Sequence, residues 1–288
     1  MRPPAPSRAR PTARKSIQGA GAVRAKRGSH TLPSFSEKAG DRQFATTLAR
    51  GLEVLRCFTA DDPLLGNKDL AERTGLPKAT ISRLAYTLTS LGYLRADYRL
   101  GKYQLGPALI SMTYPLLANI AVRQIARSAM KNLADHARGS VSLGMRDRTS
   151  IVYVETSRSS AIVAHHMSDI GQTQPMIGSA IGRAYLSACP PSEREAILNE
   201  IKVKRPAEWK RFGPRVTEGL ADYQRLGFCM MRNERRPDIH AVAVPFRRGP
   251  GGDIYAFNCV VHSYLLKPGE LENDIGPRLA AMAKSLEV

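Results

Sequence analysis

The stretch Asn67–Leu91, NKDLAERTGLPKATISRLAYTLTSL, is the feature that most constrains how this chain folds. Its pattern predicts two short helices joined by a tight turn. Asn67 is a residue type that caps a helix by bonding the free N–H groups of the first turn. Gly75 supplies the positive φ that ends the first helix. Pro77 fits the first turn of the second helix, where its missing N–H costs nothing.

The second helix has one apolar and one polar face. Its apolar stripe recurs at steps of three, four and three residues, through Ile81, Leu84, Leu88 and Leu91. The opposite face carries small or polar side chains suited to base edges and phosphates in a major groove: Lys78, Ala79, Thr80, Ser82, Arg83 and Thr87. Asn67 to Tyr86 is therefore predicted to be a DNA-binding helix-turn-helix, although an ordinary helical hairpin gives the same pattern.

Two short strand patterns follow at once, Gly92–Arg95 and Lys102–Leu105, around a turn over Ala96–Gly101. A helix-turn-helix followed by a basic hairpin is a winged helix. The hairpin cations are expected to lie along the DNA backbone, where contacts position a protein without reading sequence. These cations are Arg95, Arg99 and Lys102.

Charge is concentrated at the N-terminus. The chain has 288 residues and a net charge of +18, and residues 1–40 hold nine Lys/Arg against one acid. This length predicts two domains, and this charge favours a polyanionic partner such as nucleic acid. Residues 1–41 contain few large apolar side chains and are predicted to be a disordered basic tail. The tail is dispensable, or it adds salt-sensitive DNA affinity, or it is a presequence for import into mitochondria.

Several classes of protein are disfavoured. No run of about 20 apolar residues predicts a membrane span, and the basic N-terminus lacks the apolar core of a secretory signal. Cys57, Cys189, Cys229 and Cys259 are far apart and form no Cys-x-x-Cys pair, which disfavours a zinc site or another metal. Reduced thiols in apolar surroundings predict a cytoplasmic protein.

The pattern of apolar residues, prolines and glycines predicts how the rest of the chain is divided into segments. Residues 42–106 are predicted to be the winged helix-turn-helix domain. Its first helix spans Phe44–Thr59, with a buried stripe of Leu48, Leu52, Leu55 and Phe58. Residues 107–120 form a linker helix that Pro115 interrupts. A longer helix then runs over Leu117–Ala137, with Ile120, Ile125, Met130 and Leu133 on its apolar side.

Residues 121–288 change from helical to mixed periodicity. Strands are predicted at 140–144, 150–155, 161–166, 228–232, 239–246 and 254–262, and helices at 178–188, 191–201, 217–226 and 268–286. Residues 170–175 read as a loop. The predicted fold class is α+β, with one largely antiparallel sheet and helices packed on it.

The search for catalytic chemistry is mostly negative. There is no G-x-S-x-G elbow, H-E-x-x-H pair or P-loop, so neither an enzyme nor a cofactor is expected. Gly178–Gly182 is a run of small residues that lets a helix approach the sheet, and its first N–H groups can receive a carboxylate. His165 and His166 point to opposite faces of a strand and cannot chelate one metal together. Glu234, between arginines, reads as a salt-bridged loop acid.

Four motifs occur in one order: LPKATISRLAYTLTSLGYL with GKYQLGPAL, then SVSLGMRDRTSIVYVET, then PMIGSAIGRAYLSA, and last GFCMMRNE with IHAVAVPFRRGPGGDIYAFNCVVHSY. With them the chain resembles the IclR family of bacterial transcription regulators over roughly residues 42–288. The resemblance implies a repressor or activator that binds double-stranded operator DNA as a homodimer or tetramer. It also implies a C-terminal, GAF-like effector-binding and oligomerisation domain over residues 121–288, which senses a small organic acid.

The resemblance also implies site residues. DNA contacts carry over to Lys78, Ala79, Thr80, Ser82 and Arg83. Effector-pocket positions carry over to Val163, His166, Ser179, Ala180, Ile181, Met231, Ala241 and Asn258. AVAVP with AFNCVVH looks most like the branch that regulates aromatic-acid catabolism. Some members have an acid where Met231 stands. Because this chain lacks that acid and His166 can contact the ligand, the pocket suits an anionic or aromatic ligand.

Two rival functions stay open at this point. One is a non-specific architectural DNA-binding protein that uses the tail and the wing. The other is a small-molecule enzyme fused to a DNA-binding domain.

Overall fold

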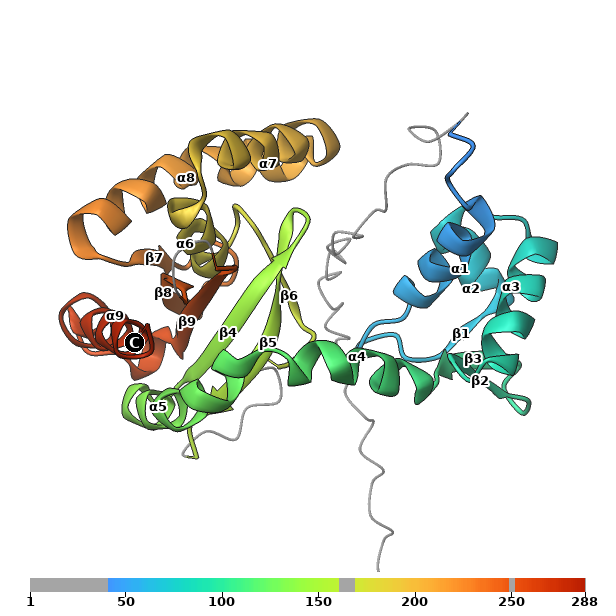
Figure 1. The fold of residues 1–288 in the computed structure, drawn as a ribbon, viewed down its shortest axis with the longest axis horizontal. Helices are drawn as coiled ribbons and strands as arrows, with labels where there is room; N and C mark the ends of the chain where they lie inside the picture. Colours follow the sequence, from blue (N-terminus) through green and yellow to red (C-terminus); the bar gives the residue numbers. More distant parts are fainter. Residues whose placement is uncertain (1–40, 161–168, 249–251, 288) are drawn as a thin grey trace, which may run out of the picture. The chain divides into compact units, whose positions relative to one another are not determined.

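The computed structural model describes residues 41–160, 169–248 and 252–287 (Figure 1). The chain divides into two compact units, the first ending at Met112 and the second beginning at Thr113. Each unit has a hydrophobic core of its own. Within the described ranges, no helix has both the length and the apolar character needed to cross a bilayer.

The first unit is a winged helix. In chain order it contains α1 (Thr46–Arg56), β1 (Leu65–Gly66), α2 (Asn67–Thr74), α3 (Lys78–Ser90), β2 (Leu94–Asp97), β3 (Lys102–Leu105) and the start of α4 (Ala108–Ala118). The strands form an antiparallel sheet in the order β1-β3-β2. Leu70, Ile81 and Leu94 are fully buried and hold α2, α3 and the sheet together. The predicted helix-turn-helix and hairpin are therefore confirmed as elements.

Three leucines assigned to buried stripes in this unit are exposed instead: Leu48, Leu52 and Leu91. The buried line runs instead through Gly51 and Val54 of α1 and continues to Phe58 beyond the helix, and Gly51 faces Leu84 of α3. Helix α3 ends at Ser90, so Leu91 lies past its last turn.

The linker does not break at its proline. Helix α4 runs without interruption through Pro115, which removes only one backbone hydrogen bond, so the prediction of an interruption there was wrong. The break lies four residues later, between the end of α4 and Ile120, the residue that precedes α5. None of the residues of α4 is buried.

The second unit contains one six-stranded sheet with helices on both faces (Figure 1). Its elements are α5 (Ala121–Ala137), β4 (Ser140–Asp147), β5 (Ser150–Arg158), β6 (Thr173–Pro175), α6 (Ala180–Ala188), α7 (Pro191–Lys204), α8 (Pro206–Leu226), β7 (Cys229–Arg232), β8 (Ile239–Arg247), β9 (Ile254–His262), a 3-10 turn (Ser263–Leu265), a π-helical turn (Leu271–Ile275) and α9 (Gly276–Ser285). The strand order is β6-β5-β4-β9-β8-β7, and every pair is antiparallel. The predicted antiparallel sheet is thus confirmed.

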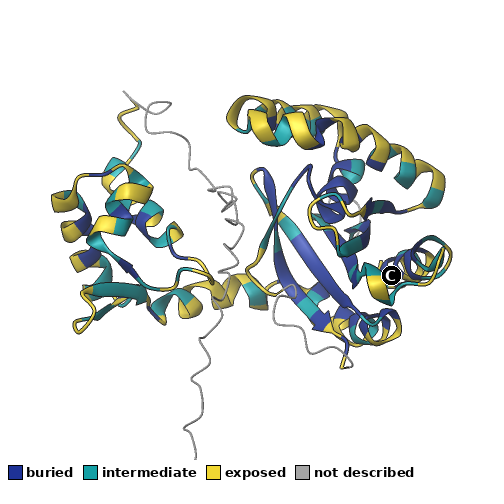
Figure 2. Cartoon of the chain, turned by 180° about the vertical axis from the view of Figure 1, so that it is seen from behind, coloured by how far each residue is buried: buried dark blue, intermediate teal, exposed yellow. Residues whose placement is uncertain are grey.

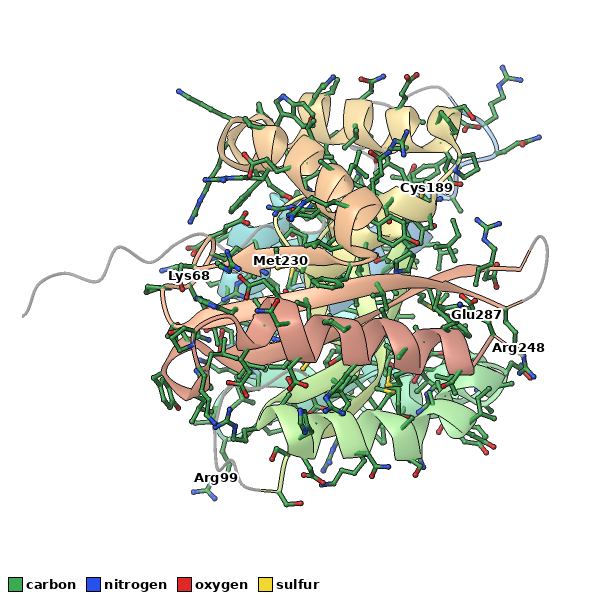
Figure 3. The ribbon with its side chains drawn as sticks, turned by 90° about the vertical axis from the view of Figure 1, so that its left-hand side faces the viewer. Lys68, Arg99, Cys189, Met230, Arg248 and Glu287 are labelled. Atoms are coloured by element: carbon green, nitrogen blue, oxygen red, sulfur yellow. The ribbon has the colours of Figure 1, made fainter. Side chains whose placement is uncertain are left out.

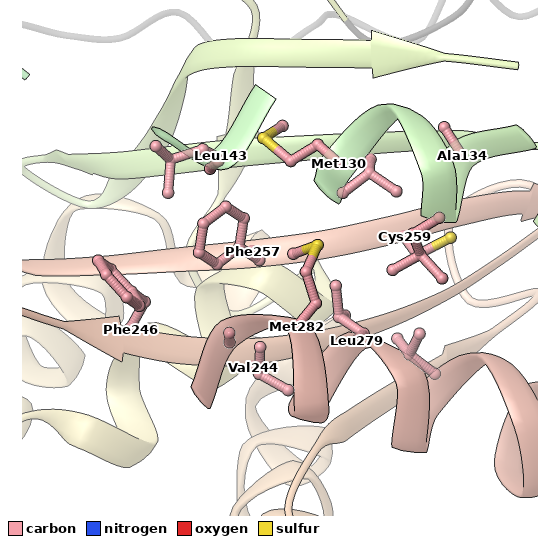
Figure 4. Packing of buried hydrophobic residues seen from close by; sticks show 14 of the residues in the cluster. Met130, Ala134, Leu143, Val244, Phe246, Phe257, Cys259, Leu279 and Met282 are labelled. Carbon is pink, nitrogen blue, oxygen red and sulfur yellow. The ribbon is translucent and has the colours of Figure 1, made fainter. Parts of the chain in front are cut away.

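Two separate cores lie on the two faces of this sheet. On one face, α5 and α9 pack over Leu143, Val244, Phe246, Phe257 and Cys259 (Figure 4). On the other face, α6, α7 and α8 cover a second core. Figure 2 shows the buried strands between helices whose outer surfaces are exposed.

Three of the four residues predicted on the apolar side of helix α5 are buried: Ile120, which precedes the helix, Met130 and Leu133. Ile125 is the exception and is exposed, whereas the alanines Ala126 and Ala134 are fully buried against the sheet.

Two further segments differ from the prediction. Residues 170–175 include the edge strand β6, which pairs with β5 from Val152↔Thr173 to Ser150↔Pro175. Helix α8 begins at Pro206, so the basic segment before residue 217 is helical too. The strand predicted at 161–166 lies outside the described residues.

Candidate DNA-reading surface and effector site

Helix α3 presents the predicted polar residues on one outward face. Lys78, Ala79, Ser82, Arg83 and Thr87 are exposed and Thr80 is half-buried, while Ile81 and Leu84 of the opposite face are buried. The Thr87 hydroxyl donates to the Arg83 carbonyl oxygen (3.0 Å), so this threonine is tied to its own helix. The fold therefore leaves a continuous polar ridge on α3.

The start of α2 differs from the prediction. Asn67 is the first helical residue and does not cap the helix; Gly66 occupies the cap position. The Asp69 carboxylate instead accepts from the Gly66 N–H (2.9 Å), while the Asn67 side chain donates to the Ser82 hydroxyl (3.1 Å). This last bond links the first helix of the motif to the reading face of the second.

The wing is a cationic hairpin. Arg95 and Arg99 are exposed and Lys102 is half-buried. The Asp97 carboxylate accepts from the backbone N–H groups of Arg99 (3.0 Å) and Leu100 (3.1 Å), which fixes the turn. The Arg99 side chain points away from the fold (Figure 3).

The cations of this surface are available for an external partner. In the described part of the chain, no carboxylate forms an ion pair with any of the five side chains Lys78, Arg83, Arg95, Arg99 and Lys102. Unpaired cations on an exposed surface suit phosphate contacts, whose strength depends on salt.

The second candidate site is at the start of α6, where three of the predicted effector residues lie. Ser179 is the N-cap: its hydroxyl accepts from the Gly182 N–H (3.2 Å) and donates to the Pro175 carbonyl (2.7 Å). Ala180 and Ile181 follow and are buried. The N–H groups at the first positions of a helix have no partner within it, and they favour negative charge.

Glycines allow α6 to approach its neighbours this closely. A Cβ on Gly182 would lie 2.0 Å from the Met176 carbonyl oxygen, so only glycine fits there. The Ile181 side chain lies over Gly144 of β4 in the same way. The small residues of this segment therefore serve close packing, as the sequence indicated.

The other predicted effector residues lie on the sheet face that α6 covers. Met231 of β7 and Ala241 of β8 pair directly in the ladder, and both belong to the core beneath α6. Asn258 of β9 is opposite Ala243, which belongs to that core too. Six of the eight predicted positions are thus brought to one region, while Val163 and His166 lie outside the described residues.

This face also contains buried or half-buried polar side chains that were not predicted as site residues: Ser140, Ser142, Tyr153 and Thr156. The Asn258 side-chain amide donates to the Tyr153 hydroxyl (2.9 Å), and the Thr156 hydroxyl donates to that of Ser142 (3.0 Å). Among the described residues, the Asn258 Oδ1 and Ser140 Oγ atoms are buried and have no hydrogen-bond partner. The alternation of small polar residues in SVSLG is the sequence signal that marks this face.

An ion pair stabilises the position of α6. Arg183 is buried; its Nε donates to the Ile177 carbonyl (3.0 Å), and its two terminal nitrogens bond both carboxylate oxygens of Glu234. Arg211 of α8 donates to the Glu234 carbonyl (3.0 Å). The predicted salt bridge of Glu234 is confirmed, but its partner comes from α6 rather than from the adjacent arginines.

Within residues 41–160, 169–248 and 252–287, no three His, Cys, Asp or Glu side chains are grouped as metal ligands.

Two family models match this chain. The IclR helix-turn-helix domain matches residues 47–97, and the bacterial transcriptional regulator IclR C-terminal domain matches residues 115–288. The HTH-type transcriptional regulator TsaQ1/TsaQ2 of Comamonas testosteroni is 31% identical over 242 residues, which are 84% of this chain and 87% of the relative.

Solved structures have the same fold. An IclR family transcriptional regulator from Brucella abortus is 41% identical, with a TM-score of 0.75 and coverage of 86% of this chain and 94% of that one. An IclR homologue from Microbacterium hydrocarbonoxydans, solved in complex with 4-hydroxybenzoate, is 22% identical, with a TM-score of 0.65 and coverage of 84% and 98%. The winged helix, the antiparallel effector domain and these matches together place the chain in the IclR family of bacterial transcriptional regulators.

Proposed function

We propose that this regulator binds a specific operator through α3 and its wing, and that a small organic acid, aromatic in kind, controls it from the second unit. Two features of one sheet face carry the effector assignment. The buried start of α6 lies over this face, and the Asn258 oxygen has no hydrogen-bond partner among the described residues. Buried polar groups without partners are costly, so such groups suit a ligand.

Operator recognition is assigned to the polar ridge of α3. Lys78, Ala79, Thr80, Ser82 and Arg83 would face the major groove, with Arg83 as the bidentate guanine contact. The wing cations Arg95, Arg99 and Lys102 would contact phosphates. We assign the protein to the cytoplasm, because a regulator of this kind has to reach the chromosome.

The effector is assigned to the region between α6 and the sheet. Its carboxylate would bind the N–H groups of Ala180 and Ile181, because a helix start favours anions. A ring hydroxyl would donate to Asn258 Oδ1, and Met231 and Ala241 would contact the ring. Support for this ligand class comes from the relative of the same fold that binds 4-hydroxybenzoate.

We assign helix α4 as the surface through which two copies of the chain form a dimer. The sequence of this helix, ALISMTYPLLA, has no charged residue, and Met112 and Leu116 are more than half exposed. Exposed apolar surface of this kind marks a protein interface. A dimer would also present two reading helices to a palindromic operator.

Calorimetric titration and thermal shift with 4-hydroxybenzoate, benzoate and the neutral analogue benzamide test the effector assignment. The wild-type chain is expected to bind 4-hydroxybenzoate most tightly and benzamide least, with stabilisation that rises with ligand concentration. Asn258→Ala should weaken 4-hydroxybenzoate selectively. The matched control is Asn199→Ala, which changes an exposed asparagine of α7. Equal binding of the acid and the amide would contradict the carboxylate assignment.

This assignment differs from its two rivals in measurable ways. An enzyme would convert the ligand, whereas the proposed regulator returns it unchanged. An architectural protein would bind unrelated duplexes as well as its own upstream DNA.

A further inference from the structure

Strand β5 contains a β-bulge. Leu143 of β4 pairs with Glu155 and the next residue, Gly144, pairs with Tyr153, so Val154 is an extra residue without a partner in the ladder. In a regular strand, residues two apart share a face. The bulge changes this: Tyr153 belongs to the core beneath α6, while Glu155 contacts α5 on the opposite face. Bulges redirect side chains in this way.

The Glu155 carboxylate is buried and paired. It lies 3.3 Å from a terminal nitrogen of Arg123 and 3.0 Å from one of Arg127, both on α5. The two arginines differ, because the Arg123 side chain is 14% exposed and that of Arg127 is 61% exposed. Arg123 is therefore the partner that shares the buried environment of Glu155.

Arg123 also contacts the linker helix. Its other terminal nitrogen donates to the Leu117 carbonyl (2.7 Å), in the last turn of α4. One planar guanidinium thus connects the sheet to the C-terminal end of the helix that leads from the DNA-binding unit. A lysine has one flexible ammonium and lacks this fork geometry.

We propose that the Glu155–Arg123 pair couples the effector site to α4, and so to DNA binding. This inference rests on the proposed function. A ligand that bonds Asn258 acts on Tyr153, its hydrogen-bond partner. Because Val154 has no partner in the ladder with β4, the part of β5 from Tyr153 to Glu155 can shift. This shift moves Arg123, the partner of Glu155, and with it the Leu117 carbonyl that Arg123 binds.

The coupling can be tested without knowing the natural effector, because linkage between two sites is reciprocal. If the effector site alters DNA binding through this pair, DNA binding must alter the strand of the effector site. The probe is a duplex from the protein's own upstream intergenic DNA. The measurement is hydrogen exchange of the full-length chain with and without this duplex.

In the wild-type chain, the duplex is expected to change exchange in residues 150–158 and 117–123. Glu155→Gln keeps the shape of the side chain and removes its charge, and Arg123→Lys keeps the charge and removes the fork. Both variants should reduce the DNA-dependent change at 150–158 at least threefold. Arg127→Ala is the matched control: it removes an ion pair to the same carboxylate without touching Leu117, and the change should persist.

Two results would overturn the inference: a wild-type complex with no change at 150–158, or an undiminished change in both variants. Because the first needs no substitution, a variant that fails to fold does not prevent the test. Failure of the proposed function gives a different result: a gel shift would show no duplex-specific complex of the wild-type chain. The coupling inference would then fail too, because it rests on that function.

Discussion

Arg183 and Glu234, 51 residues apart, form a bidentate ion pair in which the arginine is almost fully buried. The pair fastens α6 to the turn between β7 and β8, and Arg211 of α8 holds the same turn. Since the start of α6 carries the proposed carboxylate contacts, we expect this pair to help position those N–H groups.

Removing the charge of Glu234 should destabilise the second unit. Glu234→Gln leaves the Arg183 guanidinium buried without its counter-charge, and breaking such a pair costs about 3–5 kcal/mol. Urea unfolding followed by the fluorescence of Trp209, the only tryptophan, measures the loss. Glu218→Gln, in the exposed Arg215–Glu218 pair, is the control and should leave the unfolding midpoint unchanged. Equal midpoints for both variants would contradict the assigned role.

The buried thiols should make stability depend on alkaline pH. Burial raises the pKa of Cys229 and Cys259 to about 12 and that of Cys189 to about 11, from an ordinary 9.0. The folded state therefore retains thiol protons that the unfolded state releases. This stabilisation is complete below pH 9 and is lost as pH rises from 9 towards 12.

Urea midpoints at pH 8 and pH 10 check this dependence, with a lower midpoint expected at pH 10. Burial also raises the pKa of Tyr185 to about 12, which adds a loss of the same sign at the alkaline end. Cys259→Val removes one buried thiol and should make the dependence shallower. Rapid reaction of Cys189, Cys229 and Cys259 with a disulfide reagent at pH 8, in the native chain, would show that these three thiols are not buried in solution.

Charge on the apolar helix α4 should weaken self-association. Met112→Glu places a carboxylate on the proposed interface and should raise the dimer dissociation constant at least tenfold, measured by sedimentation. Val203→Glu is the control, because Val203 is an exposed apolar residue of α7. A wild-type chain that sediments as a monomer, or equal effects of the two substitutions, would rule out α4 as the interface.

Local signals in the sequence predicted most of the elements. Gly75 does have a positive φ of 70°, and the step pattern of Ile81 and Leu84 places the buried face of α3 correctly. The antiparallel sheet follows from strands separated by turn residues. These features depend on neighbours in the sequence, and periodicity reports on neighbours.

What the sequence did not predict depends on contacts between distant segments. Leu48 and Ile125 fit an apolar stripe, yet the fold exposes them and buries Gly51 and Ala126, because the face that packs is set by partners distant in the sequence. The partner of Glu234 lies 51 residues away in α6. The bulge at Val154 arises only from the register with β4, so no local pattern shows that Glu155 faces α5.

Operator recognition by α3 is tested by binding of the full-length chain to its own upstream intergenic duplex, with excess unrelated DNA and at two salt concentrations. A discrete complex that survives competitor is expected. Arg83→Ala is expected to cost on the order of 1–3 kcal/mol and to relax specificity at one base pair, while the control Arg225→Ala, in α8, changes nothing. Binding that disappears with competitor and salt, or a loss in Arg83→Ala that is uniform across sequences, would contradict base reading by α3.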